Sequence, residues 1–317
     1  MSTPPDHHPL SRRQILTWLA AAPLAVAPLT MPTEAIGQEL TAGRRGSGDQ
    51  PRGRGVEELE LRFGARIGIY ARNLSTGRTL SYRAEERLPM CSLFKPVAAA
   101  AVLAFRDRNG ELLDRRIRFQ AQEVVENSPV TSTRVEQGMT VRELCDAALR
   151  FSDNTAGNLL LRQIGGPAGL TRAARRFGDR RTRLDRWEPY LNEARPGDNR
   201  DTTTARAIGI TYARLLLGPL LTRSDRTLLL NWMTDNQTSG TRFRASLPGG
   251  WTLADKTGAG HYGALNDVGV AFSPAGVPIL ISVLSRKDQP KAAADNQLMA
   301  EAAALALDVL TSGRNHR

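Results

Sequence analysis

Hydrophobic positions alternate with polar ones near both ends of the chain and follow helical spacing between them. Residues 65–72 and 79–83 alternate like a hairpin around the turn-forming Ser75-Thr76-Gly77. This strand pattern is then absent for about 150 residues, and it returns at 251–256, 266–272 and 278–284. We therefore expect a single antiparallel sheet made from both ends of the chain.

Helical patterns occupy most of the remaining sequence. The run at 91–105, CSLFKPVAAAAVLAF, is rich in alanine and apolar enough for a buried helix, with Pro96 tolerated in its first turns. Further helices are predicted at 56–63, 141–151, 154–164, 167–177, 203–217, 224–236 and 291–310. The predicted fold class is α+β: residues 56–83 and 237–317 form an antiparallel sheet flanked by helices, and residues 84–236 form an all-helical part.

The N-terminus has the pattern of an export signal. The stretch 11–16, SRRQIL, leads into an uncharged and largely apolar run over 17–31, and adjacent arginines at this place are typical of twin-arginine export. A membrane anchor is the alternative, but the run is shorter than the ~20 residues of a span and contains prolines. We expect a signal peptide at 1–36, a flexible Gly- and Arg-rich linker at 37–55, and a folded body at 56–317 that is periplasmic or secreted, with no membrane span.

Composition narrows the possible functions. The net charge of +11 raises the question of a nucleic-acid partner, but the arginines are spread along the chain and only 5% of residues are aromatic. We therefore expect no specific nucleic-acid partner. His261 is the one histidine between the N-terminal region and the C-terminal end, which excludes a Ser-His-Asp triad and a multi-histidine zinc site. The two cysteines, Cys91 and Cys145, are too few for a disulfide framework, and we expect buried thiols.

A serine and a lysine stand three residues apart in Met90-Cys91-Ser92-Leu93-Phe94-Lys95. The chain has only four lysines and otherwise uses arginine, so Lys95 in an apolar helix is unlike an ordinary solvated lysine. Positions i and i+3 share one face of a helix, which brings the Lys95 amine close to the Ser92 hydroxyl. A partly desolvated lysine can lose its proton, whereas a guanidinium cannot, so this pair is suited to activating a nucleophile.

Two further triplets accompany this pair. Ser152-Asp153-Asn154 falls between two predicted helices, and Lys256-Thr257-Gly258 falls at the end of a predicted strand. Each has a structural alternative, since Ser, Asp and Asn cap helices and Thr-Gly favours turns. Together and in this order, the three motifs resemble the penicillin-recognising serine enzymes. The resemblance covers roughly 56–310 and implies a site where the sheet and the helical part meet.

A fourth stretch resembles the omega loop of class A β-lactamases. In Arg186-Trp187-Glu188-Pro189-Tyr190-Leu191-Asn192, a carboxylate and an amide stand four residues apart and could hold a water between them. A solvated surface loop is the alternative interpretation. The resemblance also implies an ion pair between Arg186 and Asp201 that closes the loop, and a cis peptide before Pro189.

The resemblance implies hydrolysis of the β-lactam ring through a serine acyl-enzyme, and thus β-lactam resistance, without a metal or other cofactor. Ser92 would be the nucleophile, activated by Lys95 or, through water, by Glu188, and the sequence leaves both bases open. The backbone N–H groups of Ser92 and Ala259 would form the oxyanion hole. Ser152, polarised by Lys256, would protonate the lactam nitrogen. The implied substrate-binding residues are Asn154, Asn192, Thr257, Gly258, Ala259 and Arg242.

Several positions depart from the family pattern. Some carbapenem-hydrolysing members join the position of Cys91 by a disulfide to a residue just after Lys-Thr-Gly, where this chain has Gly260. Carbapenem hydrolysis is therefore not indicated. Asn127 stands where the family usually has an aromatic residue at the cleft rim. Cys145 matches a cysteine that often pairs with a position occupied here by Ala99, so again no disulfide is expected.

Two other functions agree with part of the sequence. A D-Ala-D-Ala carboxypeptidase or transpeptidase would share the three motifs, but Glu188 and Asn192 argue against it. A non-hydrolytic β-lactam sensor would be expected to carry a broken motif, and all motifs are intact. We expect a monomeric enzyme whose partners are β-lactam small molecules.

Overall fold

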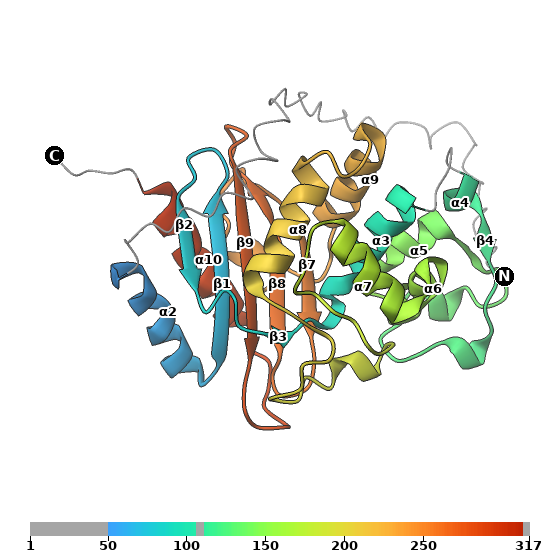
Figure 1. Cartoon of the computed structure of the whole chain (residues 1–317), viewed down its shortest axis with the longest axis horizontal. Helices are drawn as coiled ribbons and strands as arrows, with labels where there is room; N and C mark the ends of the chain where they lie inside the picture. The colour runs from blue at the N-terminus through green and yellow to red at the C-terminus, as the bar shows by residue number, and fades with distance from the viewer. Residues whose placement is uncertain (1–49, 106–110, 313–317) are drawn as a thin grey trace, which may run out of the picture. The chain divides into compact units, whose positions relative to one another are not determined.

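Both ends of the chain meet in one five-stranded antiparallel sheet in the computed structural model, which describes residues 50–105 and 111–312 (Figure 1). The strand order is β2-β1-β9-β8-β7. The bounds are β1 (Arg66–Asn73), β2 (Thr79–Tyr82), β7 (Thr252–Ala259), β8 (Leu265–Phe272) and β9 (Pro278–Arg286). β1 pairs with β9 along its whole length, from Arg66 opposite Arg286 to Asn73 opposite Ile279. Because β7 is the last strand in this order, it lies at the edge of the sheet.

Both faces of the sheet are buried under helices. Along β9, Leu280 and Leu284 belong to the core shared with α8 (Ala205–Leu217), while Ile281 and Val283 belong to the core shared with α10 (Asn296–Thr311). This alternation follows from the period of two of a strand. α2 (Gln50–Phe63) packs beside α10 on the second face.

The helical part is arranged around α3 (Phe94–Phe105). Every residue of α3 from Phe94 to Leu103 is buried, and its alanines allow neighbouring helices to pack closely on several sides. These neighbours include α5 (Val141–Arg150), α6 (Asn154–Ile164), α7 (Gly166–Arg176), α8 and α9 (Arg223–Thr234). Because α3 is held so firmly, the segment directly before it is a rigid place for a reactive side chain.

The predicted α+β fold class is confirmed, including the sheet formed by both chain ends. The middle of the chain is nevertheless not all helical. Two-residue strands pair there as β3 (Leu88–Pro89) with β6 (Thr202–Thr203) and β4 (Arg116–Ile117) with β5 (Met139–Thr140). Strands this short carry no measurable alternation, so the hydrophobic pattern could not reveal them. Short α4 (Glu111–Asp114) and the 3-10 helices η2 (Ala121–Glu123) and η3 (Thr131–Thr133) were also missed.

Several element ends differ from the predictions. α2 begins at Gln50 and not at residue 56, so the last part of the expected linker is helical, with Pro51 in the tolerant first turn. α10 begins at Asn296, where the Asp295 side chain accepts hydrogen bonds from the first backbone N–H groups, and not at residue 291. The expected signal peptide and residues 37–49 of the expected linker lie outside the described residues.

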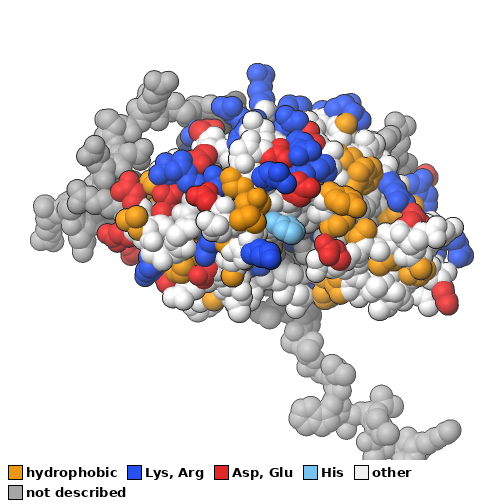
Figure 2. Space-filling model, turned by 90° about the horizontal axis from the view of Figure 1, so that it is seen from below, with side chains coloured by type: hydrophobic (Ala, Val, Ile, Leu, Met, Phe, Trp, Pro, Cys, Tyr) orange, Lys and Arg blue, Asp and Glu red, His pale blue; other side chains and the backbone are white. Residues whose placement is uncertain are grey.

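Figure 2 shows the surface as seen from below Figure 1. On this face Lys and Arg side chains are interspersed with Asp and Glu, so it carries no large field of one sign. Within residues 50–105 and 111–312, no helix is both long enough and apolar enough to cross a membrane.

Candidate active site

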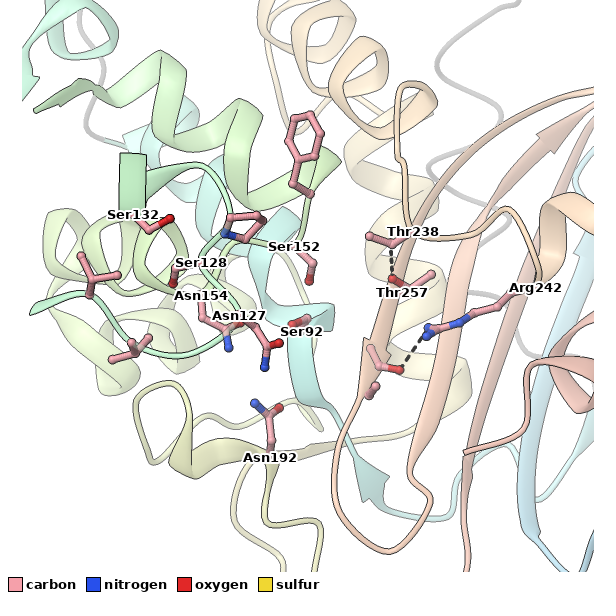
Figure 3. Close-up of a pocket in the computed structure, with 16 residues that line it drawn as sticks. Ser92, Asn127, Ser128, Ser132, Ser152, Asn154, Asn192, Thr238, Arg242 and Thr257 are labelled. Atoms are coloured by element: carbon pink, nitrogen blue, oxygen red, sulfur yellow. Dashed lines mark hydrogen bonds between the residues drawn. The ribbon is translucent and has the colours of Figure 1, made fainter. Parts of the chain in front are cut away.

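A cavity of about 650 Å³ opens between the edge strand β7 and the helical part (Figure 3). Its volume lies in the usual range for small-molecule sites. Ser92, Ser152, Asn192 and Thr257 line it, and they come from four separate segments of the chain. The structure thus brings together residues from all four sequence motifs.

Ser92 lies in the 3-10 helix η1 (Cys91–Leu93), immediately before α3. The predicted helix 91–105 is therefore two elements, and Cys91 at the start has a positive φ of 49° that a regular helix does not allow. Lys95 is on the first turn of α3 and donates from Nζ to Ser92 Oγ at 2.8 Å. Tyr212 of α8 donates from its hydroxyl to the Leu93 carbonyl at 2.7 Å, which ties η1 to the core.

Lys95 is fully buried among acceptors. Its Nζ also donates to the Ser152 carbonyl and to Asn154 Oδ1, both at 2.7 Å, and lies 3.3 Å from Glu188 Oε1. Burial lowers the pKa of Lys95, and the nearby Glu188 carboxylate opposes that shift. The amine therefore gives up its proton more readily than a solvated lysine does.

Ser152 lies at the junction between α5 and α6, as predicted from the sequence, and has a positive φ of 58°. This backbone turn directs its Oγ to a position 3.0 Å from Lys256 Nζ and 3.3 Å from Lys95 Nζ. The neighbouring Asp153 caps α6 and accepts hydrogen bonds from the backbone N–H groups of Val130 and Thr131. The junction is therefore fixed on both sides.

Lys256 is fully buried inside β7, and its Nζ also donates to the Thr257 carbonyl at 2.9 Å. Burial lowers its pKa well below the usual value, and the nearby Lys95 charge adds to that effect. Strand β7 continues through Lys256, Thr257 and Gly258 to Ala259, so the predicted end at residue 256 was wrong. The pairing of Ala259 with Leu265 on β8 keeps this stretch extended despite its turn-forming residues.

Gly258 allows β7 to approach the serine. A Cβ at this position would lie 3.2 Å from the Met90 carbonyl oxygen and 3.2 Å from Cys91 Cβ, both closer than ordinary contacts. Ala259 follows at the exposed end of the strand and lines the cavity. The edge strand and η1 thus lie side by side, which is the arrangement that a pair of backbone donors from Ser92 and Ala259 requires.

Glu188 and Asn192 are contributed by the loop that carries η4 (Tyr190–Asn192). Glu188 is buried, with Oε1 3.4 Å from Ser92 Oγ, and its Oε2 accepts a hydrogen bond from Asn192 Nδ2 at 2.5 Å. Asn192 Oδ1 is buried and accepts no hydrogen bond from the described residues. The peptide before Pro189 is cis.

An ion pair between Arg186 and Asp201 closes the loop that carries Glu188 and Asn192. Arg186 Nε donates to Asp201 Oδ2 at 2.6 Å, and the Asp201 side chain is 1% exposed. Asp201 Oδ1 also accepts the backbone N–H groups of Asp185 and Arg186 at 2.7 and 2.9 Å. A second guanidinium nitrogen of Arg186 contacts Glu193.

Arg242 reaches the far end of the cavity from the loop before η5 (Phe243–Ser246). Its guanidinium points at β7 in Figure 3 and donates to the carbonyls of Gly258 and Asn266, both at 3.4 Å. Burial lowers its pKa, and the buried Asp267 and Asp255 carboxyl groups oppose that shift. Asn127 lines the opposite side, and its carbonyl accepts the Asn154 backbone N–H at 3.0 Å.

Two residues with functional positions were missed in the sequence. Asn158 of α6 bonds both the N–H and the carbonyl of Glu188 at 3.0 Å and so fixes that residue to the helical part. Its spacing of four from Asn154 on one helix was the available signal. Thr238 contacts Thr257 in the cavity, and because it lies in an irregular loop no periodicity could have indicated it.

Cys91 and Cys145 are both buried. A Cβ at residue 260 would lie 2.7 Å from the Asn192 carbonyl oxygen, so the backbone leaves no room for a larger side chain there. Among the described residues, no cluster of His, Cys, Asp and Glu side chains could hold a metal ion.

Comparison with known proteins gives consistent matches. The model of the beta-lactamase enzyme family matches residues 53–310. A beta-lactamase from Streptomyces lavendulae is 50% identical over 304 residues, which covers 95% of this chain and 97% of that protein. A beta-lactamase from Streptomyces fradiae is 49% identical over 306 residues, with 95% and 97% covered.

Solved structures show the same similarity. A beta-lactamase from Streptomyces albus G superposes with a TM-score of 0.80 at 50% identity, covering 82% of this chain and 99% of that one. A class A beta-lactamase from Clostridium kluyveri superposes with a TM-score of 0.80 at 39% identity, covering 83% and 99%.

Proposed function

The chain belongs to the beta-lactamase enzyme family as a class A enzyme that hydrolyses β-lactams, and we propose that it does so through an acyl-enzyme on Ser92. The observation that carries this proposal is the contact among three side chains. Lys95 Nζ lies 2.8 Å from Ser92 Oγ, and Glu188 Oε1 lies 3.3 Å from Lys95 Nζ and 3.4 Å from Ser92 Oγ. A nucleophile is thus held against two possible bases.

Acylation begins when Ser92 Oγ attacks the lactam carbonyl and loses its proton. A neutral Lys95 has two N–H donors, which suit the Ser152 carbonyl and Asn154 Oδ1, and one lone pair, which suits the Ser92 proton. If Lys95 is charged instead, Ser92 donates toward Glu188, directly or through water. Both routes are compatible with the contacts, and the lowered pKa of Lys95 favours the first.

Collapse of the tetrahedral anion breaks the lactam C–N bond. We assign stabilisation of the anion to the backbone N–H groups of Ser92 and Ala259, because fixed donors act where the charge develops. Ser152 passes its hydroxyl proton to the leaving nitrogen and regains a proton from Lys95, so that the proton lost by Ser92 is in effect delivered to the nitrogen. This role is supported by the contacts of Ser152 Oγ with Lys256 Nζ and Lys95 Nζ at 3.0 and 3.3 Å.

Deacylation needs an activated water. Glu188 takes a proton from this water, the oxygen attacks the ester carbonyl, and Glu188 passes that proton to Ser92 Oγ as the ester bond breaks. Asn192 supports this step in two ways. Its amide nitrogen orients Glu188, and its Oδ1, which accepts no hydrogen bond from the described part of the chain, offers an acceptor for the water. Arg186 and Asp201 keep the loop in place.

Substrate binding is assigned to residues around the cavity. The substrate carboxylate is bound by Thr257, and Arg242, which lines the same cavity, supplies positive charge. Lys256 is fully buried in β7 beside Thr257 and adds positive charge from there when it is protonated. Asn154 contacts the acylamide side chain from the opposite wall, and the backbone of Gly258 and Ala259 runs alongside the substrate.

Intact-protein mass spectrometry with excess benzylpenicillin, run beside the loss of lactam absorbance, tests the mechanism. The parent protein is expected to consume the lactam without a lasting adduct, and Glu188→Ala to accumulate an adduct on Ser92. A lasting adduct on the parent protein would instead support the peptidase or sensor alternative. Turnover that persists in Ser92→Ala would refute the assigned nucleophile.

We further propose that residues 1–36 are a twin-arginine signal peptide and that the mature enzyme is exported as a monomer. The arginine pair in the stretch 11–16 and the uncharged run at 17–31 support this proposal. Cell fractionation of the parent and of a variant with both arginines replaced by lysine tests it, since equal export of the two would refute it.

A further inference from the structure

Thr238 lies in the loop between α9 and η5, and its hydroxyl contacts a proposed carboxylate-binding hydroxyl. Thr238 Oγ1 is 2.5 Å from Thr257 Oγ1, and either oxygen could be the donor (Figure 3). Thr238 also donates from Oγ1 to Asn236 Oδ1 at 2.7 Å and from its backbone N–H to the same oxygen at 3.0 Å. These contacts connect the cavity to the buried residues behind it.

The number of hydroxyl protons fixes the direction of the hydrogen bonds among Thr257, Thr238 and Asn236 in the unliganded protein. Asn236 Nδ2 donates to Asp255 Oδ2 at 3.0 Å, so the oxygen of the Asn236 amide must face Thr238. A hydroxyl has one proton to give. Since Thr238 gives its proton to Asn236, the short contact with Thr257 must use the Thr257 proton. Thr257 then presents only lone pairs to the cavity.

An ionised carboxylate accepts hydrogen bonds and cannot donate them. It therefore cannot be bound by Thr257 in the direction just described, and the hydroxyl protons have to turn. We propose that Thr238 is a positioning residue that reverses its hydroxyl when the substrate carboxylate arrives. Thr257 then donates to the carboxylate, and Thr238 donates to the oxygen of Thr257.

The reversal leaves no polar group without a partner. When the Thr238 proton turns to Thr257, Asn236 Oδ1 keeps its hydrogen bond from the Thr238 backbone N–H. In the bound state Thr257 both receives and gives a hydrogen bond, and such chains strengthen each member. A charged acceptor gains most from a donor polarised in this way. Thr238 would therefore favour ligands that carry a free carboxylate.

The test compares Thr238→Val with the matched variant Thr238→Ser on benzylpenicillin and on its neutral methyl ester. Valine keeps the shape of threonine and removes the hydroxyl, whereas serine keeps the hydroxyl. For Thr238→Val we expect KM for the acid to rise about fivefold, as for the loss of one ordinary hydrogen bond, with kcat unchanged because the contact is made in the ground state and the transition state alike. The ester should respond much less, and Thr238→Ser should stay close to the parent protein.

This inference rests on the proposed function, in which Thr257 binds the carboxylate, so Thr257→Val is measured in parallel. If Thr257→Val weakens binding of the acid selectively and Thr238→Val does not, the reversal is refuted and the proposed carboxylate site stands. If neither variant alters the preference for the acid over the ester, the proposed carboxylate site itself fails. Equal weakening of acid and ester by Thr238→Val, with no rescue by serine, would show a purely structural role and overturn the inference. Thermal unfolding of all variants checks that each is folded.

Discussion

Lys256 is a buried amine with no carboxylate of the described residues at ion-pair distance, and its replacement is expected to change stability and activity in opposite directions. The side chain is fully buried, and no described carboxylate forms an ion pair with it. Its two hydrogen bonds go to Ser152 Oγ and the Thr257 carbonyl. Lysine is seldom buried so completely unless it is paired. In Lys256→Met the chain keeps a side chain of similar size and loses the charge.

The expected size of the effect follows from these contacts. Desolvation of an ammonium group costs several kcal/mol even after the surroundings relax. Two lost hydrogen bonds offset about 1 kcal/mol each, and Ser152 Oγ retains its contact with Lys95. We expect a net stabilisation of about 1–2 kcal/mol, which raises Tm by about 2–4 °C per kcal/mol in a domain of this size.

The pH dependence of unfolding gives a second readout. The folded state lowers the pKa of Lys256 well below its usual value, so between that lowered pKa and about 10.4 the unfolded chain binds more protons. The contribution of Lys256 to stability should therefore increase as pH rises through this window and decrease as pH falls back through it, with no further change below the folded-state pKa. In Lys256→Met the contribution of this residue to that slope disappears.

Urea unfolding at several pH values, together with benzylpenicillin hydrolysis, measures both effects. Hydrolysis by Lys256→Met should fall by about 10²–10³, the scale for loss of one transition-state contact. Lys291→Met makes the same substitution at an exposed lysine and should change stability by less than about 0.5 kcal/mol. A Lys256→Met protein that is less stable than the parent at neutral pH would refute the reasoning, because it would show that the site stabilises the buried ammonium.

Two other variants examine the walls of the site. Gly258→Ala should force β7 and η1 apart by a few tenths of an ångström at Met90 and lower kcat/KM by about tenfold with little change in Tm; steady-state kinetics that match the parent would contradict this. Asp201→Asn removes the charge that pairs with Arg186, and we expect a loss of about 3 kcal/mol in urea unfolding and slower deacylation, seen as an acyl-enzyme in mass spectrometry. A variant with unchanged stability and no adduct would mean that Glu193 alone suffices to hold Arg186.

The sequence predicted the components of the site better than their geometry. The spacing of three between Ser92 and Lys95 on a buried, alanine-rich helix was enough to bring the two together, because helical geometry is local. The same holds for the sheet, since alternation in β8 and β9 reflects burial on both faces. Local patterns therefore identified most elements and the lysine that contacts Ser92.

Features that depend on partners distant in the sequence were not predictable. The extension of β7 past Lys256 is imposed by β8, and it overrides the turn preference of Thr257-Gly258. The positive φ of Ser152 arises where two helices meet, and nothing in a single triplet specifies it. Thr238 lies in an irregular loop, where no hydrophobic periodicity could predict the position of its hydroxyl.

The pairing of β1 with β9 also bears on how the protein is made. Arg66 is opposite Arg286, and the Asn73 side chain donates to the carbonyl of Leu310 near the far end of α10. Contacts between such distant residues close a very long loop, which makes them slow to form. During synthesis, the hairpin of β1 and β2 lacks its partner strand β9 until nearly the whole chain has been translated. A two-stranded hairpin is only marginally stable. A chain that stops before β9 thus lacks the strand that joins both halves of the sheet, so premature termination late in translation should leave no folded, active fragment.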